Sequence, residues 1–161
     1  MRFCNDCRSS TKELPRCRFP ESDVVLYVMD PIPEISGVDY DRSAAIFDPG
    51  HFEGIFDPSN PAARKTLLLE IFGLFQEESG SQVSALESFA GRASDADLRE
   101  IIHSISGSAA NLGLARLAAL CRAVELAIHE GRSFDLVACR LAVRAEYEAA
   151  CRAFSEDPLL R

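Results

Sequence analysis

Long apolar runs are missing from this sequence of 161 residues. No stretch approaches the roughly 20 apolar residues that a membrane-spanning helix needs. The first residues, "MRFCNDCRSSTKELPRC", carry charge without the apolar centre of a signal peptide. Positive charge is also scarce, because 17 basic residues stand against 25 acidic ones and give a net charge of −8. An acidic surface repels phosphate backbones and anionic lipids, so we expect neither nucleic acid nor a membrane among the partners.

Catalytic motifs are missing as well. The glycines of "GSAANLG" lack the spacing of a phosphate-binding loop or a dinucleotide fingerprint, and no strand is expected before them. The sequence contains no G-x-S-x-G nucleophile elbow. What remains is the composition of a soluble globular domain, with 47% hydrophobic and 26% charged residues.

Six cysteines are present, and half of them fit a buried core. Cys121, Cys139 and Cys151 lie in helical patterns of small and apolar residues, where buried free thiols are common. Because no export signal is recognised, we expect a reducing, cytoplasmic environment.

The other three thiols, at Cys4, Cys7 and Cys17, are weak candidates for zinc ligands. A structural zinc site needs four ligands, and its pattern normally supplies a second close pair. We therefore predict no metal site and prefer free cysteines in a flexible tail. A small zinc-dependent adaptor stays open as a separate hypothesis.

The character of the chain changes near Phe47. Residues 1–46 hold four of the eight prolines, and only "VVLYVMD" (24–30) fits regular structure there, as a short strand. "FDPGH" is expected to open a short helix that "FDPSN" ends, and helical patterns follow. We predict an irregular N-terminal extension over residues 1–46 and a helical domain over residues 47–157.

Four amphipathic patterns make up this domain. The first forms one long helix, because its apolar stripe keeps its phase across the polar "EESGSQ". Gly113 and Gly131 end the second and third helices, Ser94 or Asp95 begins the second, and Ser133 caps the fourth. Short connections between such helices predict an all-α, antiparallel four-helix bundle. The first three helices are expected at about residues 62–90, 95–112 and 114–130.

The stretch "IIHSISGSAANLG" places His103 and Gly107 inside the second helix. At about 100° per residue, His103 lies about 140° from the apolar stripe centred near Leu98, so we expect it to face solvent. An interior glycine costs roughly 1 kcal/mol against alanine, and an idle surface would more typically carry long charged side chains. The small side chains near His103 are explained if another protein must come close to the imidazole ring. The residues expected on this face are Ala96, Arg99, Glu100, Ser106, Gly107 and Ala110.

"HSISGSAANLG" resembles the signature of the histidine-containing phosphotransfer (HPt) domain. In that signature a histidine is followed, after two residues, by a lysine, a glycine, small residues, a hydrophobic residue and a second glycine. "LARLAALCRAVE" is similar to the next helix of the family, and the resemblance covers residues 47–154. It implies an HPt-type bundle with a short leading helix. It also implies a monomeric, stoichiometric phosphocarrier of two-component signalling, without turnover of its own.

The resemblance implies a role for each residue around His103. His103 would accept a phosphoryl group from the receiver-domain aspartate of a hybrid histidine kinase and pass it to the receiver domain of a response regulator. The chain would bind no cofactor, and Mg²⁺ would sit on the partner's receiver domain. Glu125, on the next helix, would accept a hydrogen bond from the other ring nitrogen and set the tautomer. The docking surface would include Ala96, Glu100, Gly107 and Ala110.

One position departs from the family pattern, since Ser106 stands where the lysine is usual. That lysine would help to hold the phosphoryl oxygens. Ser106 would donate a hydrogen bond instead, and Arg99, one turn before His103, is a candidate to replace the charge. An ordinary solvated arginine is the equal alternative for Arg99, with a pair to Asp95 one turn earlier as one form of it. Two functions stay open: an active phosphocarrier, and a degenerate HPt-like module that docks receiver or kinase domains without carrying phosphate.

Overall fold

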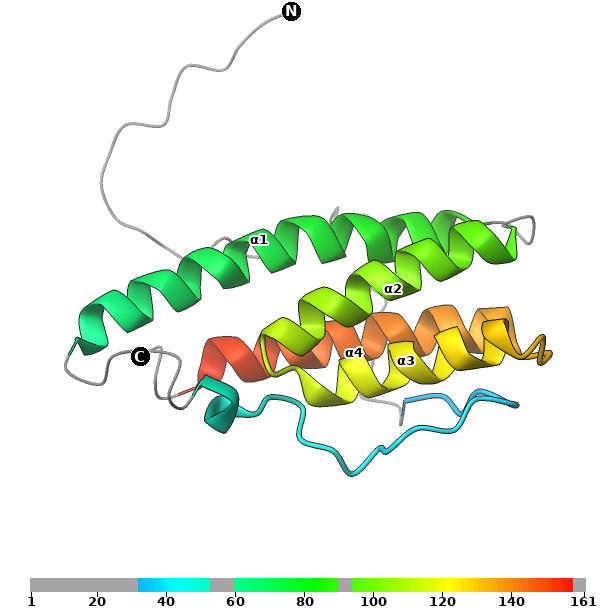
Figure 1. Cartoon of the computed structure of the whole chain (residues 1–161), viewed down its shortest axis with the longest axis horizontal. Helices are drawn as coiled ribbons and strands as arrows, with labels where there is room; N and C mark the ends of the chain where they lie inside the picture. The colour runs from blue at the N-terminus through cyan, green and yellow to red at the C-terminus, as the bar shows by residue number, and fades with distance from the viewer. Residues whose placement is uncertain (1–31, 53–59, 90–93, 158–161) are drawn as a thin grey trace, which may run out of the picture.

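The computed structural model of the chain describes residues 32–52, 60–89 and 94–157. Its four α-helices run alternately up and down and pack into a bundle, with α1 above the other three (Figure 1). Within the described residues there is no strand, so the predicted all-α four-helix bundle is confirmed. No helix in this part of the chain is long and apolar enough to cross a membrane. The elements are the 3-10 helix η2 (Pro49–Phe52), α1 (Pro61–Ser88), α2 (Asp95–Asn111), α3 (Ala115–His129) and α4 (Leu136–Glu156).

Local signals set the helix ends. Ser94 caps α2 by accepting a hydrogen bond from the backbone N–H of Asp97 at 3.2 Å. Gly113 and Gly131 follow α2 and α3 with φ values of +67° and +63°, in the left-handed region that glycine adopts most easily. These three predictions are confirmed, and "FDPGH" does open the short helix η2.

The predicted cap of the last helix is wrong. Asp135, two residues after Ser133, caps α4, and its Oδ1 accepts hydrogen bonds from the backbone N–H groups of Val137 at 2.8 Å and Ala138 at 3.1 Å. A carboxylate can accept from both amides at once, and its charge suits the positive end of the helix dipole. The carbonyl of Ser133 instead lies against Gly37, whose Cβ position would be 2.7 Å from it.

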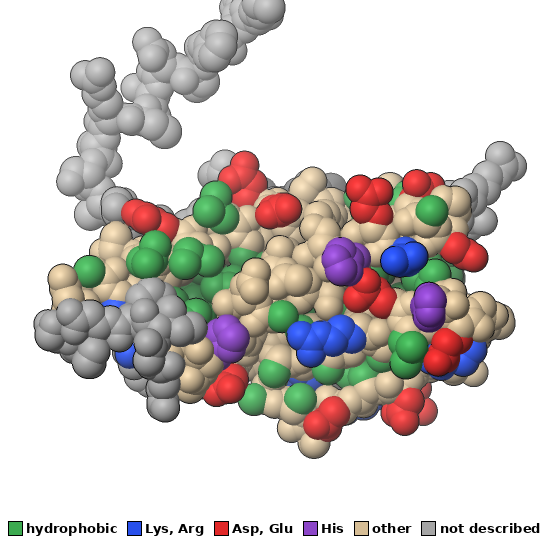
Figure 2. Space-filling view, viewed as in Figure 1, with side chains coloured by type: hydrophobic (Ala, Val, Ile, Leu, Met, Phe, Trp, Pro, Cys, Tyr) green, Lys and Arg blue, Asp and Glu red, His purple; other side chains and the backbone are tan. Residues whose placement is uncertain are grey.

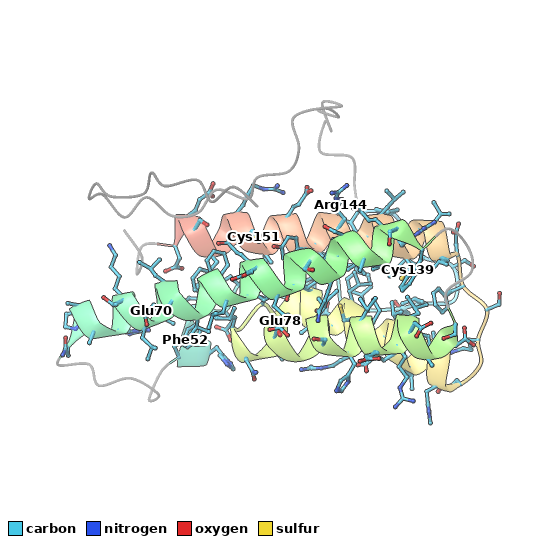
Figure 3. The ribbon with its side chains drawn as sticks, turned by 90° about the horizontal axis from the view of Figure 1, so that it is seen from above. Phe52, Glu70, Glu78, Cys139, Arg144 and Cys151 are labelled. Carbon is cyan, nitrogen blue, oxygen red and sulfur yellow. The ribbon has the colours of Figure 1, made fainter. Side chains whose placement is uncertain are left out.

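α1 is one continuous helix, as predicted, and Gly80 has a packing reason within it. A Cβ atom on Gly80 would lie 2.9 Å from the hydroxyl oxygen of Tyr147 on α4. That hydroxyl donates a hydrogen bond to the carbonyl of Gln76 at 3.1 Å. Gly80 therefore lets α4 approach α1 closely. Seen from above, α1 runs obliquely between α2 and α4 (Figure 3). Cys139, Arg144 and Cys151 follow one another along α4.

The core lies where the apolar stripes of the four helices meet. Phe72 of α1 stacks on Phe154 of α4 with 4.1 Å between the ring centroids. The apolar stripe of α2, which is centred near Leu98, is buried or half-buried along its length, and Ile102 and Ile105 are fully buried. Burial of each such side chain contributes roughly 1.5–3 kcal/mol to folding.

Residues 32–47, called the strap here, form no helix or strand and lie along α3 (Figure 1). They nevertheless belong to the packed domain, because Ile35 and Val38 are buried. The hydroxyl of Tyr40 donates to Glu146 of α4 at 3.1 Å, and burial, followed by the charge of Glu146, raises the pKa of Tyr40 to about 12. The other oxygen of Glu146 accepts a hydrogen bond from Arg116 of α3 at 2.8 Å.

Several predictions concern residues that the structure does not describe. The candidate strand at 24–30 lies there, as do the three N-terminal thiols and the "FDPSN" end of the short helix. The strap shows only that the last part of the predicted extension, residues 32–46, packs on the bundle.

Candidate functional site

His103 projects from the middle of α2 into solvent. Its side chain is 77% exposed, whereas the preceding Ile102 is 0% exposed. The sequence-based prediction of an outward histidine is therefore confirmed. Histidine side chains stand at the surface on the face shown in Figure 2, with acidic and basic side chains beside them.

Glu125 of α3 holds the ring of His103 from one side. Nδ1 of His103 lies 2.7 Å from Oε1 of Glu125, whose side chain is only 22% exposed. An ionised carboxylate can only accept hydrogen bonds, so Nδ1 carries the proton and donates it. The neutral ring then has its lone pair on Nε2. Among the described residues none forms a hydrogen bond with Nε2, and this nitrogen is free to act as a nucleophile.

The pairing of His103 with Glu125 depends on the tight turn between α2 and α3. Gly113 reverses the chain there, and the backbone N–H of Leu114 donates to the carbonyl of Ala109 at 2.9 Å. η2 and the residue before it lie against this turn. The N–H of Asp48 donates to the carbonyl of Gly113 at 2.8 Å, and a Cβ atom on Gly113 would lie 2.8 Å from Cβ of His51. With the turn fixed, the antiparallel helices come into the register that sets residue 103 opposite residue 125.

A second contact fixes the rotation of α2 about its own axis. Gln82 of α1 donates from Nε2 to Oγ of Ser104 at 2.6 Å. Ser104 follows His103 directly and points about 100° away from it around α2, so this hydrogen bond on the α1 side helps to keep the imidazole turned away from α1. Sequence reasoning missed Gln82, which was read only as part of a polar interruption in the stripe of α1.

Small residues flank His103 at several positions of the surrounding surface, where the longer side chains of Arg99 and Glu100 are also exposed. Ala96, Glu100 and Gly107 are exposed, and Ala110 is half-buried. A Cβ atom on Gly107 would meet no atom within 4 Å. Internal packing therefore does not require a glycine at this position, unlike at Gly80.

The predicted place of Ser106 on the outer face is wrong, because this residue is only 5% exposed. Three residues after His103, it lies about 60° around α2 from it, on the side toward the buried stripe. Arg99 is exposed, and within the described part of the chain it makes no ion pair with Asp95. The pair with Asp95 is therefore absent from the described residues, and an ordinary solvated arginine stays the alternative for Arg99.

The remaining candidate groups do not converge on a second site. His51 lies on η2 with its ring edge against Phe52 at 5.3 Å between centroids, and His129 is the exposed last residue of α3. Cys121, Cys139 and Cys151 are buried and form no disulfide, as predicted. Burial raises the pKa of the Cys121 thiol, and it raises that of Cys139 to about 12. No three metal-ligating side chains come together among the residues that can be described.

Comparison with known proteins agrees with this geometry. The family model described as Hpt domain matches residues 70–153, which are 84 of the 161 residues of the chain. The match runs from within α1 to within α4 and contains both His103 and Glu125. No curated protein and no solved structure matches the chain.

Removal of the Glu125 carboxylate is expected to change the tautomer of His103. In the wild type, the neutral ring keeps its proton on Nδ1, whereas Glu125→Ala should shift the proton to Nε2, which a free histidine prefers. Two-dimensional ¹H–¹⁵N NMR of the imidazole nitrogens measures this difference, and His129 is the internal control that should not change. An identical tautomer of His103 in both proteins would contradict the role given to Glu125.

Proposed function

This chain belongs to the Hpt domain family, and we propose that it carries a phosphoryl group on Nε2 of His103 between two receiver domains. Hpt domains take part in histidine phosphotransfer in phosphorelays and are phosphocarriers rather than catalysts. The single observation that carries the assignment to His103 is its geometry. The ring is exposed, its Nδ1 is held by Glu125, and its Nε2 is free.

The chemistry needs little beyond this ring. The lone pair of Nε2 attacks the phosphorus of an aspartyl phosphate, the new P–N bond forms, and the P–O bond to the aspartate breaks. The aspartate leaves as a carboxylate, and the ring becomes a cation that keeps its proton on Nδ1. Glu125 lies 2.7 Å from that nitrogen and offsets the new charge. Transfer to the second receiver domain is the same step in reverse.

The partner supplies the rest of the machinery in this proposal. Phosphoryl transfer depends mostly on positioning and on neutralisation of charge. A receiver domain of a hybrid histidine kinase acts as the donor and that of a response regulator as the acceptor, each with its own Mg²⁺, in the cytoplasm. The present chain contributes the oriented ring and the surface formed by Ala96, Glu100, Gly107 and Ala110, which admits either partner in turn.

The buried position of Ser106 limits what it contributes. With 5% exposure it lies beneath the face that a phosphoryl group would occupy. We therefore assign to a charged surface residue the role of the usual lysine, which is to donate hydrogen bonds to the phosphoryl oxygens. Arg99, exposed and one turn from His103, stays a candidate.

Transfer of phosphate from a phosphorylated receiver domain in Mg²⁺ tests the proposal. The wild type should acquire an acid-labile phosphoryl group, seen as a shifted band on a phosphate-affinity gel, and His103→Gln should acquire none. His129→Gln is the matched control, since it removes another exposed histidine and should behave as the wild type. If several receivers bind the chain and none phosphorylates it, the protein is a docking module that carries no phosphate.

Replacement of Gly107 separates the needs of folding from those of docking. Gly107→Ala should raise the free energy of unfolding by about 0.5–1 kcal/mol, because the helix gains a better residue and no clash. It should also slow transfer from a receiver by about tenfold, because the methyl group stands where the partner approaches. Urea unfolding and transfer kinetics measure the two effects.

Gly73→Ala is the control, since a Cβ there also meets no atom within 4 Å. Gly73 lies on α1, nine residues before Gln82, which is roughly 13 Å along the helix. This variant should be stabilised similarly and transfer at the wild-type rate. Unchanged transfer in Gly107→Ala would contradict the docking role of this glycine.

A further inference from the structure

The register of α2 and α3 places an arginine opposite Ser106. His103 and Glu125 face each other across the two antiparallel helices at 2.7 Å. Three residues toward the connecting turn, α2 carries Ser106 and α3 carries Arg122. Both positions therefore lie about 4.5 Å along the helix axes from the His103–Glu125 pair, on the same side of it.

Arg122 shares its side of α3 with Glu125. Residues three apart are neighbours on a helix surface, and Arg122 is exposed where Glu125 is half-buried against α2. Arg122 thus lies on the solvent side of the α2–α3 interface, one turn of α3 from the residue that holds the imidazole.

Most arginines of the bundle form a hydrogen bond or an ion pair, whereas Arg122 forms neither with the described residues. Arg116 and Arg132 pair with Glu146 and Glu130, and Arg140 donates to backbone carbonyls. Among the residues that the structure describes, Arg122 has no hydrogen bond and no ion pair. In a chain with a net charge of −8, a free guanidinium beside an exposed histidine is a ready binding group for an anion.

Arg99 is the other arginine of α2 and α3 that forms no ion pair with the described residues, and its surroundings are less suited to an anion. Arg99 stands in the first turns of α2 with Asp95, Asp97 and Glu100, all exposed. These three carboxylates repel a phosphoryl group that carries negative charge. Near Arg122 the acidic neighbour is Glu125, whose carboxylate is already engaged with His103.

We infer that Arg122 binds the phosphoryl oxygens of phosphorylated His103 and supplies, from α3, the positive charge that the usual lysine supplies from α2. The small, buried Ser106 leaves no long side chain of α2 between Arg122 and the ring. A planar guanidinium can also donate two parallel hydrogen bonds to a phosphoryl group. This inference rests on the proposed phosphorylation of His103.

A small phosphodonor tests the inference without a docking partner. Phosphoramidate transfers its phosphoryl group directly to histidine, with cleavage of its P–N bond and release of ammonia. The full chain is incubated with phosphoramidate, and the formation of phosphohistidine is followed by ³¹P NMR in the wild type, Arg122→Gln, Arg122→Lys and Arg152→Gln. Arg152 is an exposed arginine on α4, so its variant changes the net charge equally and controls for the global field.

Arg122→Gln should be phosphorylated about tenfold more slowly than the wild type, since it loses a charge-assisted hydrogen bond to the phosphoryl group. Arg122→Lys should recover most of the rate, and Arg152→Gln should match the wild type. Equal rates in the wild type and in Arg122→Gln would overturn the inference and leave the proposed function intact. Absence of phosphohistidine in every protein, with phosphoramidate and with phosphorylated receivers alike, would overturn the proposed function and the inference with it.

Discussion

The hydrogen bond between Nδ1 of His103 and Glu125 joins two helices that a single tight turn connects, and the chemistry of the site depends on it. It holds the ring in one orientation, and because a carboxylate only accepts, it leaves the lone pair on Nε2. A change of one residue in the register of α2 and α3 would separate the two groups and turn one of them away. The site therefore depends on the left-handed turn at Gly113, under η2, because this turn sets the register of the two helices.

The far side of α3 shows how the carboxylate is kept in place. Arg116, on the same helix as Glu125, pairs with the buried Glu146 of α4, and the strap adds the hydroxyl of Tyr40 to this cluster. A buried ion pair of this kind adds little net stability, because desolvation offsets most of the attraction, but loss of one partner is costly. Its consequence here is a defined position of α3 between α4 and α2, and hence a defined position for Glu125.

Much of the fold follows from patterns within single helices, and what could not be predicted lies between helices. The apolar stripes gave the bundle, and a count of 100° per residue placed His103 in solvent. The same count put Ser106 on the outer face, because it contains no information about how far the neighbouring elements cover α2. Gln82 and the packing of the strap were missed for a similar reason, since their partners are distant in sequence. The cap of α4 was predicted at Ser133 and lies at Asp135, because both residue types are suitable caps and the sequence alone did not separate them.

The central claim is that Glu125 leaves Nε2 of His103 as the nucleophile, so the atom that carries phosphorus is the most direct test. The ¹⁵N-labelled chain, phosphorylated by a receiver domain in Mg²⁺, can be studied by NMR through the coupling between ³¹P and the ring nitrogens. The account predicts coupling to Nε2 of His103, with the proton still on Nδ1. Phosphorus on Nδ1, or on another histidine, would contradict it.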